Sequence, residues 1–149
     1  MDPKLRVTFD ATGTGFQEQW SWIGKDVAWL VYDPQKSGQI TSSLQWFGHR
    51  TFNLYFGDGY EAMSVLDANG DSWLTGEELD GLALWHDMNG DGKCDPGEVQ
   101  ALTEWSIVGL SARGVRDASH PEGFLHSAGG VRFRDGTTRT SFDVILQPR

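Results

Sequence analysis

LDANGDSWLTGEELDGLALWHDMNGDGKCDPGE, residues 66–98, contains two twelve-residue runs that begin with Asp and end with Glu. In both runs, oxygen-bearing side chains stand at positions one, three, five, nine and twelve. A hard cation such as Ca²⁺ binds six to eight oxygens at about 2.3–2.6 Å. Such a loop provides them from alternate side chains, one backbone carbonyl and a bidentate carboxylate. The spacing therefore predicts two calcium-binding loops.

The first run, residues 67–78, departs from this pattern at one position. Ser72 occupies position six, where glycine is preferred because the turn requires a positive φ, so we expect a weaker site. Leu74, at position eight, is expected to turn inward and pair with its counterpart in a partner loop. The expected ligands are the side chains of Asp67, Asn69 and Asp71, the carbonyl of Trp73, Thr75 directly or through water, and Glu78 as the bidentate clamp.

The second run, residues 87–98, matches the pattern at every position, including Gly92 at position six. Cys94 stands at position eight, where a small apolar residue fits, so we interpret it as a packing residue and not a nucleophile. A solvated turn is the alternative for one Asp-, Asn- and Gly-rich run, but two copies in register favour metal binding. The expected ligands are the side chains of Asp87, Asn89, Asp91, Asp95 and Glu98 and the carbonyl of Lys93.

Short helices are expected around these loops. Only residues 79–86 separate them, which leaves room for one shared helix, with Leu79, Leu82, Ala83 and Trp85 on its inner side. Apolar residues at helical spacing predict further helices at residues 60–66 and 99–105, and a strand is expected at 107–110. We therefore predict an α+β fold of short helices around two tandem EF-hand-like loops, with flanking strands.

Two degenerate loops precede the intact ones. Each follows an expected strand, at residues 4–10 and 28–33, and opens with Asp10 or Asp33. Both keep a glycine at position six. Threonines at positions three and five and Ser21 at position twelve leave the first loop too few carboxylates, while Lys36 and Leu44, which stands in place of the terminal acid, make the second a poor site. We interpret them as copies that keep the turn and have lost the metal; two unrelated glycine turns are the alternative.

The remaining segments complete one domain, residues 1–149, divided into 1–58, 59–110 and 111–149. Residues 44–59 are expected to be an irregular connection over the core, and 113–126 a polar loop. Residues 129–146 predict a β-hairpin that turns at Asp135-Gly136. Its expected buried face comprises Val131, Phe133, Phe142, Val144 and Leu146. The tryptophans are expected in the core; a sugar-binding platform is the alternative.

Charge and composition limit the possible functions. Residues 67–98 hold nine acids against one base, Lys93, which gives −8 of the net charge of −9. Bound cations would relieve this self-repulsion, and the acidic balance argues against nucleic acid. We expect no membrane span, no cleavable signal peptide, no disulfide and a monomer. The four histidines form no HExxH pattern, and no GxSxG or phosphate loop occurs, so no enzyme is expected.

The chain resembles the EF-hand-like calcium-binding module of secreted bacterial repeat-in-toxin (hemolysin-type) proteins, which is related to their calcium-dependent self-processing module. The glycine-rich nonapeptide repeats of those proteins do not occur here, so we expect a lone module or a piece of a longer protein. The resemblance implies an extracellular setting after type I secretion. The residues that carry it are FDATGTGF (9–16), WLVYDPQKSGQI (29–40), WFG (46–48), DGYEAMSVLDANGD (58–71), LALWHDMNGDGKCDPGEVQALTEWSI (82–107) and FRDGTTRTSFDVIL (133–146).

Three functions are compatible with these patterns. The leading hypothesis is a structural or adhesive module of a secreted protein, folded or stabilised by two Ca²⁺ ions. A second is a calcium sensor that exposes an apolar groove to a protein partner. The third, implied by the resemblance, is calcium-dependent self-processing at an Asp-Pro bond. Such bonds occur at Asp2-Pro3, Asp33-Pro34 and Asp95-Pro96.

Overall fold

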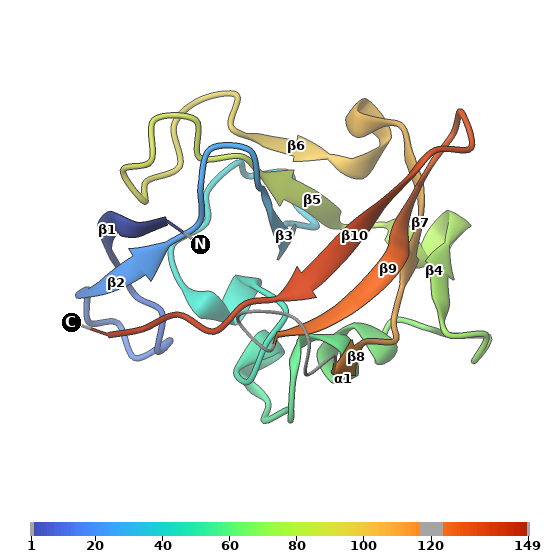
Figure 1. Cartoon of the computed structure of the whole chain (residues 1–149), viewed down its shortest axis with the longest axis horizontal. Coiled ribbons are helices and arrows are strands. Elements are labelled where there is room, and N and C mark those ends of the chain that lie inside the picture. The colour runs from blue at the N-terminus through green and yellow to red at the C-terminus, as the bar shows by residue number, and fades with distance from the viewer. Residues whose placement is uncertain (1, 117–123, 149) are drawn as a thin grey trace.

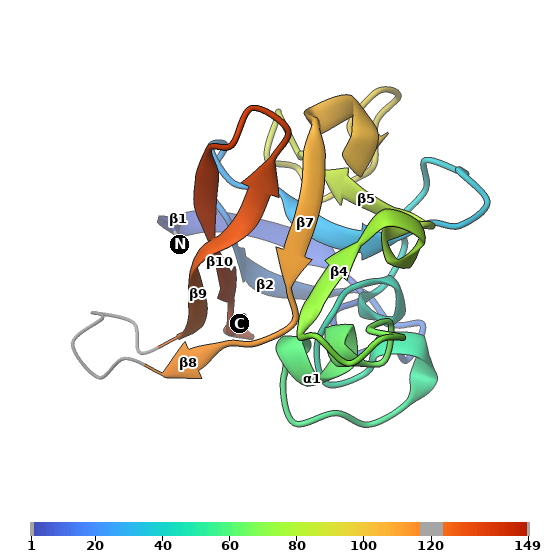
Figure 2. The same cartoon turned by 90° about the vertical axis from the view of Figure 1, so that its right-hand side faces the viewer.

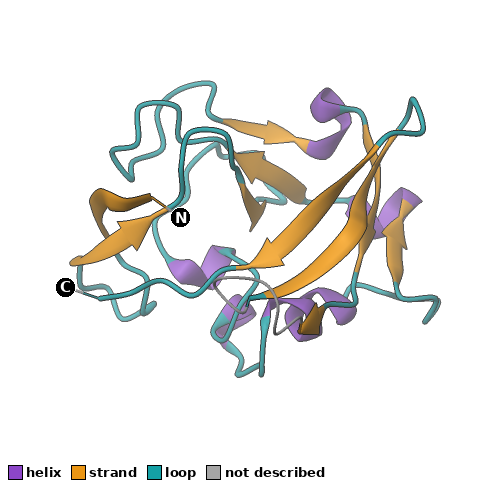
Figure 3. Cartoon of the chain, viewed as in Figure 1, coloured by secondary structure: helices purple, strands orange, loops and turns teal. Residues whose placement is uncertain are grey.

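The computed structural model describes residues 2–116 and 124–148, with side chains from residue 4 onward. Within these ranges the chain is mostly β, with one six-residue α-helix and four short 3₁₀ helices (Figures 1 and 3). The expected α+β fold, with helices around the loops, is therefore wrong. The strands are β1 Asp2–Phe9, β2 Glu18–Trp22, β3 Trp29–Tyr32, β4 Trp73–Thr75, β5 Leu82–Trp85, β6 Val99–Ala101, β7 Ile107–Ser111, β8 Val115–Arg116, β9 Leu125–Phe133 and β10 Thr138–Asp143. The helices are η1 Ser43–Gln45, η2 Thr51–Asn53, α1 Gly59–Ser64, η3 Gly76–Leu79 and η4 Leu102–Trp105.

The strands form three antiparallel sheets. Strands β1 and β2 pair with each other, and a second sheet has the order β3-β5-β6. The third sheet has the order β10-β9-β7-β4, with β8 also paired to β9. Figure 1 shows β1 and β2 at one end of the molecule and β4 and β7 at the other; Figure 2 turns the second end toward the viewer. The intact loop at residues 87–98 thus connects β5 and β6 within one sheet, whereas the intact loop at residues 67–78 contains β4 of the third sheet.

The segment between the intact loops is a strand, where we expected a helix. After η3, Gly81 turns the chain with φ 81°, and a side chain there would meet Tyr32. Residues 82–85 then run between β3 and β6, so their backbone groups are paired on both sides. Leu82, Ala83 and Trp85 are buried. A short apolar run of this kind has no period that separates a central strand from a buried helix, which explains the error.

The helix expected at residues 99–105 is also wrong. The chain there forms β6 and then η4, which ends at Ser106 in the left-handed region with φ 58°. The helix expected before the first intact loop is confirmed as α1, where Asp58 is the N-cap and accepts the N–H of Glu61. The strands expected around residues 4–10, 28–33 and 107–110 are confirmed as β1, β3 and β7.

The C-terminal hairpin is confirmed as β9 and β10, with Gly136 at φ 87° in the turn. Val131 and Phe133 pack against the core, but Phe142 is 46% exposed, so its place on the buried face is wrong. Residues 117–123 of the expected polar loop lie outside the described residues; within the described part, β8 pairs with β9.

Two contacts fasten β10 to α1. The hydroxyl of Tyr60 donates to the carbonyl of Ser141, 2.9 Å away, and the N–H of Gly59 donates to Asp143 Oδ2 at 2.9 Å. Burial raises the pKa of Tyr60 to about 12, and burial also raises the pKa of Asp143. The helix that leads into the first intact loop is therefore fixed to the C-terminal hairpin.

The core consists of two clusters. The first is aromatic, around Phe9, Trp22, Trp46 and Trp85, with Trp29 packed at its side. The second is largely aliphatic and includes Met63, Leu74, Leu82, Leu102 and Leu110. Trp22 and Trp85 are fully buried, as expected for core tryptophans. None of the described helices is long and apolar enough to cross a membrane.

Candidate metal centre

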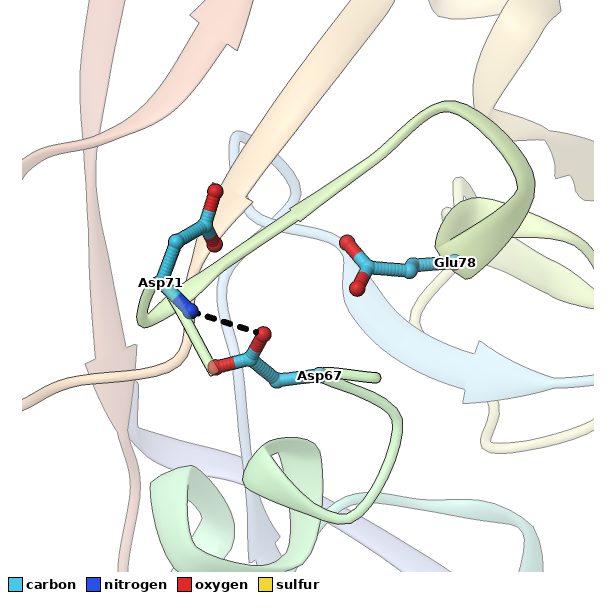
Figure 4. Close-up of side chains that lie close together, drawn as sticks. All are labelled: Asp67, Asp71 and Glu78. Carbon is cyan, nitrogen blue, oxygen red and sulfur yellow. Dashed lines mark hydrogen bonds between the residues drawn. The ribbon is translucent and has the colours of Figure 1, made fainter. Parts of the chain in front are cut away.

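Loop 3, residues 67–78, brings three carboxylates together. One oxygen each from Asp67, Asp71 and Glu78 lies within 4.8 Å of the other two. Figure 4 shows Asp67 and Asp71 on one side of the loop and Glu78 facing them from η3. Among the described residues, no other group of three or more Asp, Glu, His or Cys residues converges to this extent. This arrangement could hold a metal ion.

Backbone N–H groups orient these oxygens. Asp67 Oδ1 accepts from Gly70 and Asp71, while Asp67 Oδ2 accepts from Ser72 at 2.8 Å. Further along, Asn69 Oδ1 accepts from Asp71, and Asp71 Oδ1 accepts from Trp73. Glu78 closes the loop, because its Oε1 accepts from Ala68 and its Oε2 from Thr75. Backbone N–H groups thus orient every predicted side-chain ligand of loop 3 except Thr75, and this orientation does not require a cation.

Loop 4, residues 87–98, repeats this hydrogen-bond pattern position by position. Asp87 Oδ1 accepts from Gly90 and Asp91, and Asp87 Oδ2 accepts from Gly92 at 2.8 Å. Position three accepts from position five and position five from position seven. Glu98 Oε1 accepts from Met88 and Oε2 from Asp95. The sequence-level match between the two runs therefore corresponds to one backbone geometry.

The carboxylates of loop 4 are nevertheless arranged differently from those of loop 3. Asp87 and Glu98 are 4% and 3% exposed, whereas Asp67 and Glu78 are half-buried. The amide of Asn89 lies between two carboxylates and donates to Asp91 at 3.2 Å and to Asp95 at 2.8 Å. Lys93 is exposed at position seven. The more complete sequence match is thus the more buried loop, while the acidic oxygens converge in loop 3.

Ser72 adopts the conformation that glycine favours. Its φ is 68°, close to the 73° of Gly92 at the same position of loop 4. A non-glycine residue in this region costs about 1–2 kcal/mol. Serine at position six therefore strains the backbone of loop 3, but the loop keeps the same turn as loop 4.

Loops 1 and 2, residues 10–21 and 33–44, have the same turn. Asp10 Oδ2 accepts from Gly15 and Asp33 Oδ2 from Gly38, both at 2.8 Å. Positions four and six have positive φ in all four loops: Gly13 and Gly15, Lys36 and Gly38, Gly70 and Ser72, Gly90 and Gly92. The interpretation that these copies keep the turn is confirmed; their loss of the metal stays a prediction.

Uncharged groups close loop 2 where the intact loops use glutamate. The N–H of Thr41, at position nine, donates to Gln45 Oε1 at 2.9 Å, and Gln45 Nε2 donates to the carbonyl of Gln39 at 2.9 Å. That carbonyl belongs to position seven, the backbone ligand of a calcium loop. In loop 1, the hydroxyls of Thr12 and Thr14 bond to each other at 2.8 Å. In both loops, hydrogen bonds to uncharged side chains thus occupy these polar groups.

Position eight joins loop 2 to loop 4. The N–H of Ile40 donates to Cys94 Sγ at 3.2 Å, and the thiol donates to the carbonyl of Ile40 at 3.6 Å. Burial raises the pKa of Cys94 to about 11, so the thiol stays protonated at neutral pH, as expected for a packing residue. Leu74 of loop 3 instead faces Leu110 of β7, so its expected pairing with another loop is wrong.

Three residues near the loops escaped the sequence reasoning. Trp22 and Trp85 donate their indole N–H groups to Asp87 and Glu98, and the Arg132 guanidinium lies 3.4 Å above the ring of Trp73. Trp22 and Arg132 are far from the loops in sequence, and only the folded sheets bring them close. A long-range contact of this kind leaves no local pattern.

Comparison with known proteins places the chain in a family. Residues 2–147 match the SPM domain, and the chain belongs to the SPM domain family. The chain is also similar to the Iron-regulated protein FrpA of Neisseria meningitidis serogroup C, with 28% identity over 145 residues. That alignment covers 93% of this chain and 13% of FrpA, so the chain spans a small part of its relative.

Proposed function

We propose that this chain is a calcium-binding structural module of a secreted protein, stabilised by one Ca²⁺ ion at loop 3 and one at loop 4. The observation that carries the proposal is the hydrogen-bond pattern shared by the two loops. It holds carboxylate and amide oxygens at positions one, three, five and twelve, the positions a calcium loop uses. The carbonyls of Trp73 and Lys93 supply position seven, and Thr75 and Asp95 supply position nine.

Electrostatics supports the same proposal. The segment around the two loops carries −8 of the net charge of −9, and two divalent cations would cancel half of that local charge. A ligand that binds only the folded state stabilises it by about 2.7 kcal/mol at 100 times its Kd. At such saturating concentrations, two calcium ions would contribute a large share of the stability of a domain of this size.

The proposed setting is extracellular. It rests on the resemblance to secreted repeat-in-toxin proteins. Extracellular calcium modules have Kd values of about 10⁻⁴–10⁻³ M, so even a strained loop such as loop 3 would be occupied at millimolar calcium. We propose a monomer whose partners, beyond calcium, are other parts of the secreted protein.

The test is ion stoichiometry together with stability. Calorimetric titration with calcium should give two ions per chain, and the thermal midpoint should rise strongly in calcium compared with EDTA. Magnesium at equal concentration serves as the control, because it prefers rigid octahedral geometry and is expected to give a smaller shift. An identical midpoint in calcium and EDTA would refute the proposal.

A second candidate function is calcium-dependent cleavage at Asp2-Pro3. Of the three Asp-Pro bonds, the other two belong to carboxylates that are already engaged. Asp33 accepts from Ser37 and Gly38, and Asp95 accepts from Asn89. Asp2-Pro3 begins β1, and the side chain of Asp2 is not among the described ones. Intact-mass measurement after incubation with calcium would reveal loss of the first two residues, with Asp2→Asn as the control; an unchanged mass excludes this function.

A further inference from the structure

Loop 4 places its two terminal ligands in the aromatic cluster. Asp87 and Glu98 stand at positions one and twelve, and both side chains are almost fully buried. Two fully buried tryptophans reach them: Trp22 from β2 and Trp85 from the end of β5. Loop 3 differs, because its terminal carboxylates are half-buried and, among the described residues, accept from backbone N–H groups alone.

Each indole donates to one of these carboxylates. Trp22 Nε1 lies 2.7 Å from Asp87 Oδ2, and Trp85 Nε1 lies 3.3 Å from Glu98 Oε2. The two rings also pack edge to face, with centroids 5.6 Å apart. The donors to the first and last ligands of the loop are therefore fixed relative to each other by one aromatic contact.

The indoles complete the hydrogen bonding of oxygens that water reaches poorly. Asp87 Oδ2 already accepts the N–H of Gly92, and a carboxylate oxygen accepts about two hydrogen bonds. With Trp22 added, Oδ2 accepts two hydrogen bonds, as Oδ1 already does from Gly90 and Asp91, so the carboxylate is held through both of its oxygens. A buried carboxylate that lost such a donor would pay a desolvation penalty and gain rotational freedom.

We infer that Trp22 and Trp85 are positioning residues of the loop 4 calcium site, which hold the carboxylates of Asp87 and Glu98 in their binding orientation. The inference rests on the proposed calcium binding at this loop. Groups that orient metal ligands from outside the coordination shell typically change metal affinity by about 10–100-fold when removed. The geometry also links the metal to the aromatic core, because the same two rings pack against Phe9.

The closing experiment isolates loop 4. In a Glu78→Gln background, which disables loop 3, calcium is titrated calorimetrically into the parent and into Trp22→Phe and Trp85→Phe. Phenylalanine keeps a ring but removes the N–H. We expect the Kd for calcium to rise about tenfold in each variant.

The matched control is Trp29→Phe. Trp29 packs on Trp22 and Trp46 in the same cluster, with ring centroids 5.3 Å and 4.5 Å away, but its indole N–H has no hydrogen-bond partner among the described residues. Its substitution is expected to leave the Kd unchanged. If calcium affinity fell equally in all three variants, the tryptophans would act through packing alone, and the inference would be overturned.

A second measurement does not depend on whether the tryptophan variants fold. In ¹⁵N-labelled Glu78→Gln protein, the indole N–H resonances of Trp22 and Trp85 should shift on calcium addition and return with EDTA, while that of Trp29 moves less. Calcium binding without such shifts would overturn the inference alone. Absence of any calcium binding in the Glu78→Gln background would instead refute the proposed function at loop 4.

Discussion

Loops 1 and 2 and loops 3 and 4 have the same backbone turn with different chemistry inside it. All four open with an aspartate whose Oδ2 accepts the N–H of position six. Only loops 3 and 4 add a terminal glutamate; loop 2 closes on the amide of Gln45, and loop 1 has Ser21 at position twelve. The comparison teaches that the opening aspartate and two positive-φ residues specify the turn, whereas the closing residue specifies the charge available to a metal.

Removing the clamp of loop 4 should have the largest effect. Glu98→Gln keeps the shape but removes a buried charge to which three groups donate hydrogen bonds, two of them through Oε2. We expect the free energy of unfolding in saturating calcium to fall by about 3 kcal/mol, from lost ion binding and weaker hydrogen bonds. Chemical denaturation measures it, and exposed Glu104→Gln in η4 is the control. If Glu98→Gln lowered the free energy of unfolding no more than Glu104→Gln does, the terminal glutamate of loop 4 would stabilise the protein no more than the uncharged closure of loop 2.

The clamp of loop 3 should matter less, because Glu78 is half-buried. Terbium replaces calcium at oxygen ligands, and Trp73 at position seven would sensitise its emission when excited. We expect Glu78→Gln to abolish this emission and to lower the free energy of unfolding in calcium by about 1–2 kcal/mol. Glu77→Gln, at the neighbouring exposed position, should keep the emission. Emission that survives Glu78→Gln would place the sensitised ion elsewhere.

The sequence predicted the loops better than the framework that carries them. The turn at each opening aspartate is local, because it depends on an Asp side chain and a glycine a few residues later. The expected helix at 79–86 failed for the opposite reason: a strand in the middle of a sheet is decided by its neighbours β3 and β6, from distant parts of the chain. The hydrogen bond from Trp22 to Asp87 likewise joins residues that are far apart in the sequence.

Loop 2 should respond to pH and not to calcium. Burial alone would raise the pKa of Asp33, but hydrogen bonds from Gly38 and from the N–H and hydroxyl of Ser37 together lower it below the ordinary 3.8. A lowered folded-state pKa means that the ionised carboxylate stabilises the fold above pH 3.8, and that this contribution is lost as pH falls below that value.

Asp33→Asn should therefore lower the free energy of unfolding at pH 7 by about 1–2 kcal/mol. In metal-free buffer its stability should fall less steeply than that of the wild type below pH 4. Calcium stoichiometry should stay at two ions per chain. A drop in stoichiometry would show that loop 2 binds an ion, and the contrast between the N-terminal and C-terminal loops would then be incorrect.

The smallest expected effect is at position six of loop 3. Ser72→Gly should remove left-handed strain of about 1–2 kcal/mol, while the added freedom of the unfolded chain costs about 0.5–1 kcal/mol. The net gain should be about 0.5 kcal/mol in metal-free protein. Ser64→Gly, in α1, relieves no strain, meets the entropic cost and loses the hydrogen bond from the Ser64 hydroxyl to the carbonyl of Glu61, so it should destabilise. If Ser72→Gly also destabilised, the serine would be contributing something that the glycine of loop 4 does not, and position six would not explain any difference in calcium affinity between the two loops.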